Sequence, residues 1–293
     1  MSTYGAAIVA RNDNYGGDLV EKASYVLNAA LETMDEVIYV DWNSDGNNLV
    51  TDLKNNLIYP ERLKYIVVTP DMAKRFTNYQ EVTQPVSEVL ARNIGISRLS
   101  TDFLISTNID VLVPPRRYLE TIKDVTTMYA IPKYMLSWND IKSAGGMKED
   151  VRETLIEFIA PNGDMFNTPG MGKQGKTALF EGDIWSMVNG CGDFQIAHRH
   201  IWYDIKGFEE SLLGRGYADS NLHKKAWLAG YNIDVLWDLF VFHIGHDNGN
   251  AGGANAGVGY WNDGNLAVKE FTTSTNTGNW GFFDDEELKI QSL

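Results

Sequence analysis

The sequence predicts an α/β fold with an open, mixed and mainly parallel sheet. Three observations indicate it. The chain opens with two short apolar runs separated by a segment of helical spacing, and a further apolar run lies at Phe103–Ser106. Polar residues follow directly where each run ends. Open α/β sheets bind their ligands beyond the carboxyl ends of the strands, so these polar residues are the candidate functional residues.

The first two runs form a βαβ unit. Residues 5–10, GAAIVA, are expected to form a buried strand, and residues 19–33 have the apolar spacing of the helix that returns the chain. The run 37–40, VIYV, is the second strand, which a right-handed crossover makes parallel to the first. A third strand is expected at 65–68, followed by a polar linker.

The segment 91–115, ARNIGISRLSTDFLISTNIDVLVPP, carries the densest group of candidate residues. Its first part is expected to be a helix that bears Arg92, whose planar fork of donors suits either a diphosphate or a surface ion pair. The strand at Phe103–Ser106 then leads into Asn108 and Asp110. An isolated Asp in such a turn most often binds neighbouring backbone N–H groups, which is the simpler interpretation of Asp110.

Composition excludes several classes of function. The 293 residues, 44% hydrophobic and 22% charged, are typical of a globular protein with a sizeable core. The net charge of −14 argues against binding to nucleic acid or to anionic lipid. The single cysteine, Cys191, fits a reducing compartment. We find neither a signal peptide nor an apolar run long enough for a transmembrane segment, and we expect a cytoplasmic protein.

A second group of candidates lies at 189–246. Asp219 comes just before the helical segment LHKKAWLAG, where a carboxylate is favoured as a cap, and this is its simplest interpretation. His243 and His246 follow the apolar run at 239–242. On a straight strand they would point to opposite faces, but a turn at the intervening Gly245 would bring both imidazoles to one centre.

Four other segments have less specific interpretations. Residues 170–177 have the spacing of a phosphate-binding GxxxxGKT loop, but polar residues and Pro169 precede them where a buried strand is required, so we reject this match. The Gly/Asn-rich residues 247–265 are expected to be a mobile lid. A helix is expected near 148–158, and an ordered docking point at 279–281.

The segment 91–115 resembles the donor site of GT-A glycosyltransferases, many of which read ARN-x-G, a hydrophobic strand, D-x-D and a proline. Here Asn108-Ile109-Asp110 stands in the place of D-x-D. The resemblance implies that Asp110 holds the divalent metal that bridges the diphosphate of a nucleotide-sugar. It places Asn108 near the ribose or a metal-bound water, where an amide can still form hydrogen bonds.

The loop after the second strand is similar to the VDDGSTDG signature of family 2 glycosyltransferases, although Trp42 departs from it. This likeness implies that Asp41 contacts the uracil or ribose of the donor. Arg11, in the loop after the first strand, is a further candidate contact to the nucleotide-sugar. Ordinary turn chemistry would explain both loops equally well if they stood alone.

The block 189–246 resembles both family 2 and the β-1,4-galactosyltransferase group through the residues Gly192–Gln195, Arg199, Gly207-Phe208 and Ala218–Leu222. The resemblance makes Asp219 the general base of an inverting enzyme, although Ala218 replaces the usual Glu. It also implies that Asp193 contacts a sugar, that His246 is a late metal ligand and that His243 is a weaker one. Imidazole suits Mn²⁺ better than Mg²⁺.

Together these features predict a GT-A, Rossmann-like nucleotide-binding domain at 1–246, with a nucleotide-sugar half at 1–115 and an acceptor half at 134–246, followed by a lid and tail at 247–293. The implied function is metal-dependent transfer of a sugar, with inversion, from a UDP-sugar to a glycan, glycolipid or protein acceptor. The alternatives are a retaining GT-A enzyme, a nucleotidyltransferase, for which the acidic loop after the first strand is a poor fit, and a non-catalytic carbohydrate-binding protein.

Overall fold

The computed structural model describes residues 2–14, 17–44, 46–78, 86–145, 148–154, 192–213, 218–236, 239–245 and 276–293. Strands and helices alternate in its N-terminal part: β1 (Tyr4–Ala10), α1 (Leu19–Thr33), β2 (Glu36–Trp42), α2 (Leu49–Leu53), η1 (Pro60–Arg62), β3 (Leu63–Val68), α3 (Pro70–Phe76), α4 (Glu88–Ile96) and β4 (Phe103–Asn108). The predicted strands and the predicted helix at 19–33 are confirmed, and the strands extend slightly beyond their predicted limits.

The rest of the described chain contributes β5 (Val111–Leu112), α5 (Arg116–Leu119), β6 (Thr127–Ala130), β7 (Lys133–Leu136), α6 (Trp138–Ala144), β8 (Phe194–His198), α10 (Arg199–Asp204), α11 (Ala218–Leu228), β9 (Asn232–Val235), β10 (Val241–Ile244), η2 (Trp280–Phe282) and β11 (Gln291–Ser292). Residues 149–154 are also helical, which agrees with the helix predicted near 148–158 as far as the chain is described.

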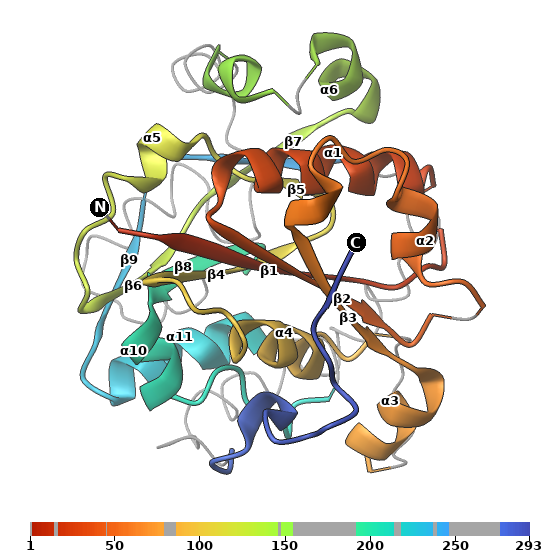
Figure 1. Ribbon diagram of the computed structural model, residues 1–293. Coiled ribbons are helices and arrows are strands. Elements are labelled where there is room, and N and C mark those ends of the chain that lie inside the picture. The colour runs from red at the N-terminus through yellow and green to blue at the C-terminus, as the bar shows by residue number, and fades with distance from the viewer. Residues whose placement is uncertain are drawn as a thin grey trace, which may run out of the picture.

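Among the described residues, eight strands form one sheet in the order β11-β3-β2-β1-β4-β8-β6-β9 (Figure 1). Strands β3, β2, β1 and β4 are parallel, whereas β8 runs antiparallel to both β4 and β6. A second, smaller sheet has the order β5-β10-β7. The larger sheet is therefore open, mixed and mainly parallel, as the sequence predicts.

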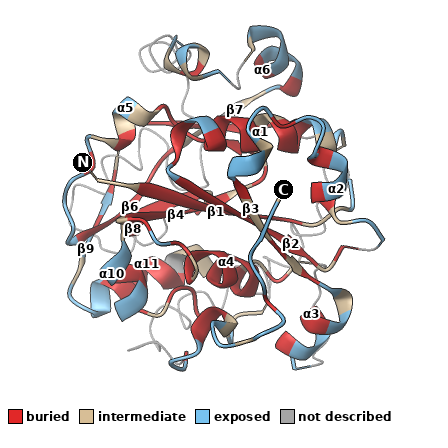
Figure 2. Cartoon of the chain, in the orientation of Figure 1, coloured by how far each residue is buried: buried red, intermediate tan, exposed pale blue. Residues whose placement is uncertain are grey.

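Helices cover both faces of the larger sheet, because each parallel connection must cross over one face or the other. Figure 1 shows α1 and α2 on one face and α4, α10 and α11 on the opposite face. Buried residues occupy the central strands and the helix sides that face them (Figure 2). Two hydrophobic layers thus hold the strands from both sides.

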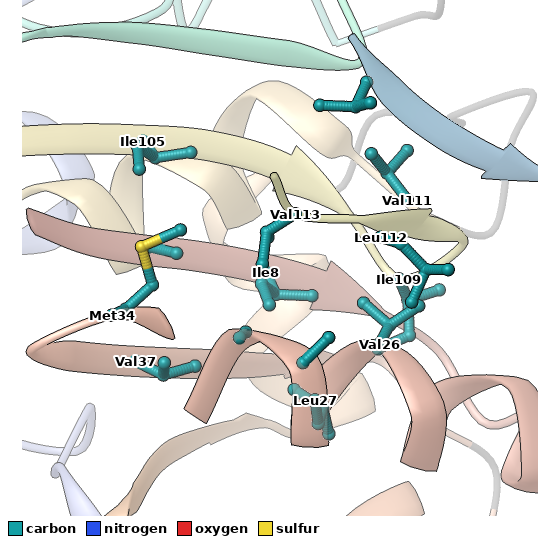
Figure 3. Packing of buried hydrophobic residues seen from close by; sticks show 14 of the residues in the cluster. Ile8, Val26, Leu27, Met34, Val37, Ile105, Ile109, Val111, Leu112 and Val113 are labelled. Carbon is teal, nitrogen blue, oxygen red and sulfur yellow. The ribbon is translucent and has the colours of Figure 1, made fainter. Parts of the chain in front are cut away.

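The layer beneath α1 fixes the relative positions of β1 and β4. Figure 3 shows Ile8 and Ile105 from these strands with Val26 and Leu27 of α1 and Val113 beyond β5, and none of these side chains is exposed to solvent. Burial of each contributes about 1.5–3 kcal/mol. This packing keeps the carboxyl ends of β1 and β4 in a fixed relation, which matters because polar residues follow both ends.

The C-terminal segment 276–293 returns to this framework. Its strand β11 pairs antiparallel with β3, and η2 packs on α4. Trp280 is only 5% exposed, and Arg98 donates hydrogen bonds to the carbonyl oxygens of Gly281 (2.8 Å) and Phe282 (2.7 Å). Gly281 has a φ of 67° and approaches the carbonyl of Asn93 too closely for a side chain. The predicted docking point at 279–281 is confirmed.

Several predicted features lie outside the described residues, namely His246, the GxxxxGKT-like segment 170–177 and the expected lid at 247–265. Within the described ranges, no helix combines the length and the apolar character that crossing a membrane requires.

Candidate active site

Polar residues from several elements meet at one edge of the larger sheet. The carboxyl ends of β1, β2 and β4 lie at the same edge because these strands are parallel. The amino end of β8 joins them because β8 is antiparallel to β4, with Thr107 opposite Phe194. The fold therefore brings Asn108, at the end of β4, beside Asp193, immediately before β8.

Arg92 lies beneath this edge. Its side chain is only 3% exposed, so the ion pair that it forms with Glu88 is largely buried and is not the predicted surface pair. The guanidinium donates to Ser106 Oγ (3.1 Å) and to the carbonyl oxygen of Gly192 (3.2 Å). It also donates to Glu88 Oε2 (3.2 Å), one helical turn earlier, and to Asn108 Oδ1 (2.5 Å). Arg92 thus connects α4 with β4 and with Gly192, which lies two residues before β8. Its contact with a diphosphate stays a prediction.

Asp193 lies between an amide and an ammonium group. Its Oδ1 accepts a hydrogen bond from Asn108 Nδ2 (3.2 Å), and its Oδ2 accepts one from Lys133 Nζ. Its backbone carbonyl accepts from Thr107 Oγ1 (2.9 Å). Burial alone would raise the pKa of Asp193, but the positive charge of Lys133 and the nearby His243 hold that pKa below its ordinary value. Asp193 is therefore an ionised carboxylate.

Asp219 is the second residue of α11, so it lies inside the first turn of that helix and not just before the helix, where the sequence predicted a cap. Its carboxylate packs against Gly192 so closely that a side chain at position 192 would occupy the same space. Burial raises the pKa of Asp219 to about 6 against the opposing attraction of Arg92, and the carboxylates of Glu88 and Asp193 add to the rise. A carboxyl group with this pKa changes protonation state just below neutral pH.

Asp110 and His243 form a pair on the side of the smaller sheet. Asp110 precedes β5, His243 lies on β10 opposite Val111, and Asp110 Oδ2 is 3.4 Å from His243 Nε2. Two ligands of one octahedral divalent ion lie on the order of 3 Å apart when each is about 2.1 Å from the ion. The oxygen and nitrogen donors of this pair therefore fit a divalent cation. The described residues contain no group of three or more His, Cys, Asp or Glu side chains arranged for a metal.

The loops after β1 and β2 are fastened to each other. The backbone N–H of Asn12 donates to Ser44 Oγ (2.8 Å), which in turn donates to Asp41 Oδ1 (2.5 Å). Asp41 is fully buried, and its Oδ2 accepts from the backbone N–H of Leu49 (2.7 Å) at the start of α2. Burial raises the pKa of Asp41 despite these hydrogen bonds. Asp41 shapes the loop, and its contact with a nucleotide stays a prediction.

Arg11 follows β1 at the same edge, and its Nε lies 3.7 Å from Asp13 Oδ2. The side chain of Arg11 is 14% exposed, so part of it is accessible to a ligand. Its contact with the nucleotide-sugar remains a prediction.

Lys133 is the residue that sequence reasoning missed. It begins β7, in the smaller sheet, and reaches Asp193 beside the larger one. The available signal was a lysine within the otherwise apolar run YAIPKYML. Its proximity to Asp193 depends on the packing of two sheets, which no local pattern shows.

The strand order and the covering helices are those of the GT-A fold, a Rossmann-like α/β architecture. Among solved structures of this class, the chain resembles GalNAc-T7, solved with UDP, GalNAc and Mn²⁺, with a TM-score of 0.52 and 13% identity. It also resembles the mannosyltransferase PcManGT of Pyrobaculum calidifontis, in complex with GDP-Man and Mn²⁺, with a TM-score of 0.50 and 13% identity.

Each alignment covers 85% of this chain but only 44% of the GalNAc-T7 chain and 58% of the PcManGT chain. The chain thus spans about half the length of these proteins, and at this identity the likeness is one of fold. The sequence itself matches no protein-family model and no curated protein. The likeness to family 2 and to the β-1,4-galactosyltransferase group stays a prediction from the motifs.

Proposed function

We propose that this chain is a metal-dependent glycosyltransferase that transfers a sugar from a nucleoside diphosphate sugar to an acceptor hydroxyl. The observation that carries the proposal is the meeting of the Asp110–His243 pair with Asp193 and Asp219 at the ligand-binding edge of a GT-A sheet. Both similar structures named above contain a nucleotide and Mn²⁺, which supports the same chemistry here.

Asp110 and His243 would hold the divalent ion, together with the predicted ligand His246. Mn²⁺ fits this mixture of carboxylate and imidazole better than Mg²⁺, which prefers oxygen ligands. When bound, the ion supplies positive charge that stabilises the leaving diphosphate. The protein has a net charge of −14, so we expect that a diphosphate needs this compensation in order to bind.

Asp219 is the proposed general base. Its pKa of about 6 leaves it mostly ionised near neutral pH and still basic enough to accept a proton. The acceptor oxygen attacks the anomeric carbon as the bond from that carbon to the diphosphate oxygen breaks, and Asp219 takes the hydroxyl proton. Attack opposite the leaving group inverts the configuration of the sugar. Arg92 stabilises the ionised carboxylate before the transfer.

The donor is proposed to be a UDP-sugar because the loop at Asp41 resembles uridine-binding loops. The test is a panel of UDP-glucose, UDP-galactose, UDP-N-acetylglucosamine, UDP-N-acetylgalactosamine and GDP-mannose with MnCl₂, scored by release of nucleoside diphosphate. Release by the wild type that is lost in Asp110→Ala supports the proposal. Asp71→Asn is the matched control, because the side chain of Asp71 is 97% exposed on α3.

Absence of turnover with every donor would contradict the assignment of an enzyme. Binding of a free sugar without turnover would favour the non-catalytic carbohydrate-binding alternative. Transfer with retention of the anomeric configuration, read by NMR of the product, would contradict the role of Asp219 as the base of an inverting reaction.

A further inference from the structure

A continuous row of polar contacts crosses the candidate active site. Arg92 Nη2 donates to Asn108 Oδ1, and Asn108 Nδ2 donates to Asp193 Oδ1. Asp193 Oδ2 then accepts from Lys133 Nζ. We call these four side chains the polar relay. Arg92 lies on α4, Asn108 on β4 and Lys133 on β7, and Asp193 comes immediately before β8. The relay therefore connects the larger sheet with the smaller one.

Position 108 must supply both an acceptor and a donor. The guanidinium of Arg92 has only donors to offer, whereas the ionised Asp193 has only acceptors. An amide satisfies both neighbours at once, with distances of 2.5 Å and 3.2 Å. A carboxylate at this position would place a negative oxygen against Asp193 Oδ1 at about 3 Å, where like charges repel strongly. The Asn in place of the first Asp of D-x-D is therefore matched to Asp193.

The relay has a buried end and an accessible end. The side chain of Arg92 is 3% exposed, whereas those of Lys133 and Asp193 are 18% and 19% exposed. The largely buried Lys133–Asp193 pair is expected to contribute little net stability to the fold, because the desolvation of both charges offsets their attraction. The Lys133–Asp193 pair is the part of the relay that a ligand can reach. Its carboxylate accepts and its ammonium donates, which suits adjacent sugar hydroxyls.

We propose that Lys133 and Asp193 together bind hydroxyl groups of the transferred sugar and that Asn108 is a positioning residue that orients Asp193 for this contact. The inference rests on the proposed function and deepens it. It assigns to Lys133 a role in recognising the sugar and to Asn108 a role distinct from contact with the metal.

A reciprocal exchange tests the match between positions 108 and 193. The four proteins are the wild type, Asn108→Asp, Asp193→Asn and the double variant. The first single variant sets two carboxylates against each other, and the second removes the charge that Lys133 binds. The double variant restores one amide and one carboxylate, so that each neighbour again finds a partner of the required kind.

The readouts are the steady-state constants for the donor found in the panel above and, by calorimetry with MnCl₂, the Kd of its free nucleoside diphosphate. We expect each single variant to raise KM for the donor by about tenfold or more, the size of a lost hydrogen bond to a charged group. The Kd of the nucleoside diphosphate should change by less than about threefold, because it lacks the sugar. The double variant should have a lower KM than the worse single variant, because the amide–carboxylate pairing of positions 108 and 193 is restored although position 193 no longer carries the charge.

Lys133→Met tests the proposed contact of Lys133 with the sugar independently of positions 108 and 193. We expect the same rise in KM with an unchanged Kd for the nucleoside diphosphate. Lys142→Met is its matched control, because Lys142 of α6 forms an exposed ion pair with Glu21 of α1 (3.3 Å). This control should leave both constants unchanged.

Two results would overturn the inference. Tighter Mn²⁺-dependent binding of the nucleoside diphosphate by Asn108→Asp would show that position 108 contacts the metal. A double variant no better than the worse single variant would show that the two positions are not matched. Melting temperatures of the four proteins without nucleotide separate this inference from the proposed function. If the wild type binds no donor, the proposed function fails, and recovery of the melting temperature in the double variant still demonstrates the Asn108–Asp193 match.

Discussion

Replacement of Asp219 by Asn tests the mechanism most directly. The substitution keeps the shape of the side chain and its place against Gly192, but it removes the ability to accept a proton. If Asp219 is the base, transfer should fall by a factor on the order of 10² to 10⁴, the usual contribution of general base catalysis. Asp219 lies inside the first turn of α11, where loss of one negative charge costs the helix at most about 1 kcal/mol, so the start of α11 should persist.

The same substitution should make the protein more stable. The pKa of Asp219 is about 6 in the folded protein against an ordinary value of 3.8. A carboxyl group whose pKa rises on folding binds its proton more tightly in the folded state, so it costs stability as pH rises through this interval. The cost reaches about 3 kcal/mol above pH 7. Asn carries no charge and avoids this cost. The free energy of unfolding of Asp219→Asn should therefore exceed that of the wild type by nearly this value at about pH 8, and the difference should vanish below about pH 4.

Denaturant unfolding of both proteins at these two pH values measures the difference. Asp193→Asn is the control with the opposite sign, because the pKa of Asp193 is lowered and its ionised form stabilises the folded state. That variant should be less stable than the wild type at about pH 8. Full activity of Asp219→Asn would show that Asp219 is not the general base. A gain in stability that does not grow with pH would refute the claim that burial of the ionised Asp219 destabilises the folded protein.

Three further predictions concern neighbouring residues. UDP should bind only with Mn²⁺ present, and Asp110→Ala should abolish this dependence; calorimetry that shows equal affinity with and without metal would contradict it. Gly192→Ala should lower transfer by on the order of 10²-fold, because its methyl group displaces the Asp219 carboxylate, whereas Gly278→Ala, whose methyl group meets nothing within 4 Å, should not. Asn93→Ala should cost about 1–3 kcal/mol in denaturant unfolding, because a buried backbone N–H that donates to Asn93 Oδ1 (2.8 Å) would lose its acceptor. An unchanged free energy of unfolding would count against that account.

The regular elements within residues 1–115 could be predicted from the sequence. The apolar runs at 5–10 and 37–40 and the helical spacing at 19–33 reflect only which neighbouring side chains are buried. Parallel pairing followed from the crossover, and the polar residues at the strand ends followed from that pairing. The antiparallel β8 between β4 and β6 could not be predicted in this way, because its pairing joins segments far apart in the chain.

The sequence by itself determined the α/β class, the edge of the sheet where ligands are expected, and the candidates Asp110, Asp193 and Asp219. Only the tertiary structure decided what surrounds them. Asn108 bridges a buried guanidinium to a carboxylate that lies 85 residues later, and Lys133 reaches that carboxylate from another sheet. These contacts and the raised pKa of Asp219 depend on strand register and burial, which are properties of the packed chain, whereas the spacing of apolar residues is a property of each segment alone.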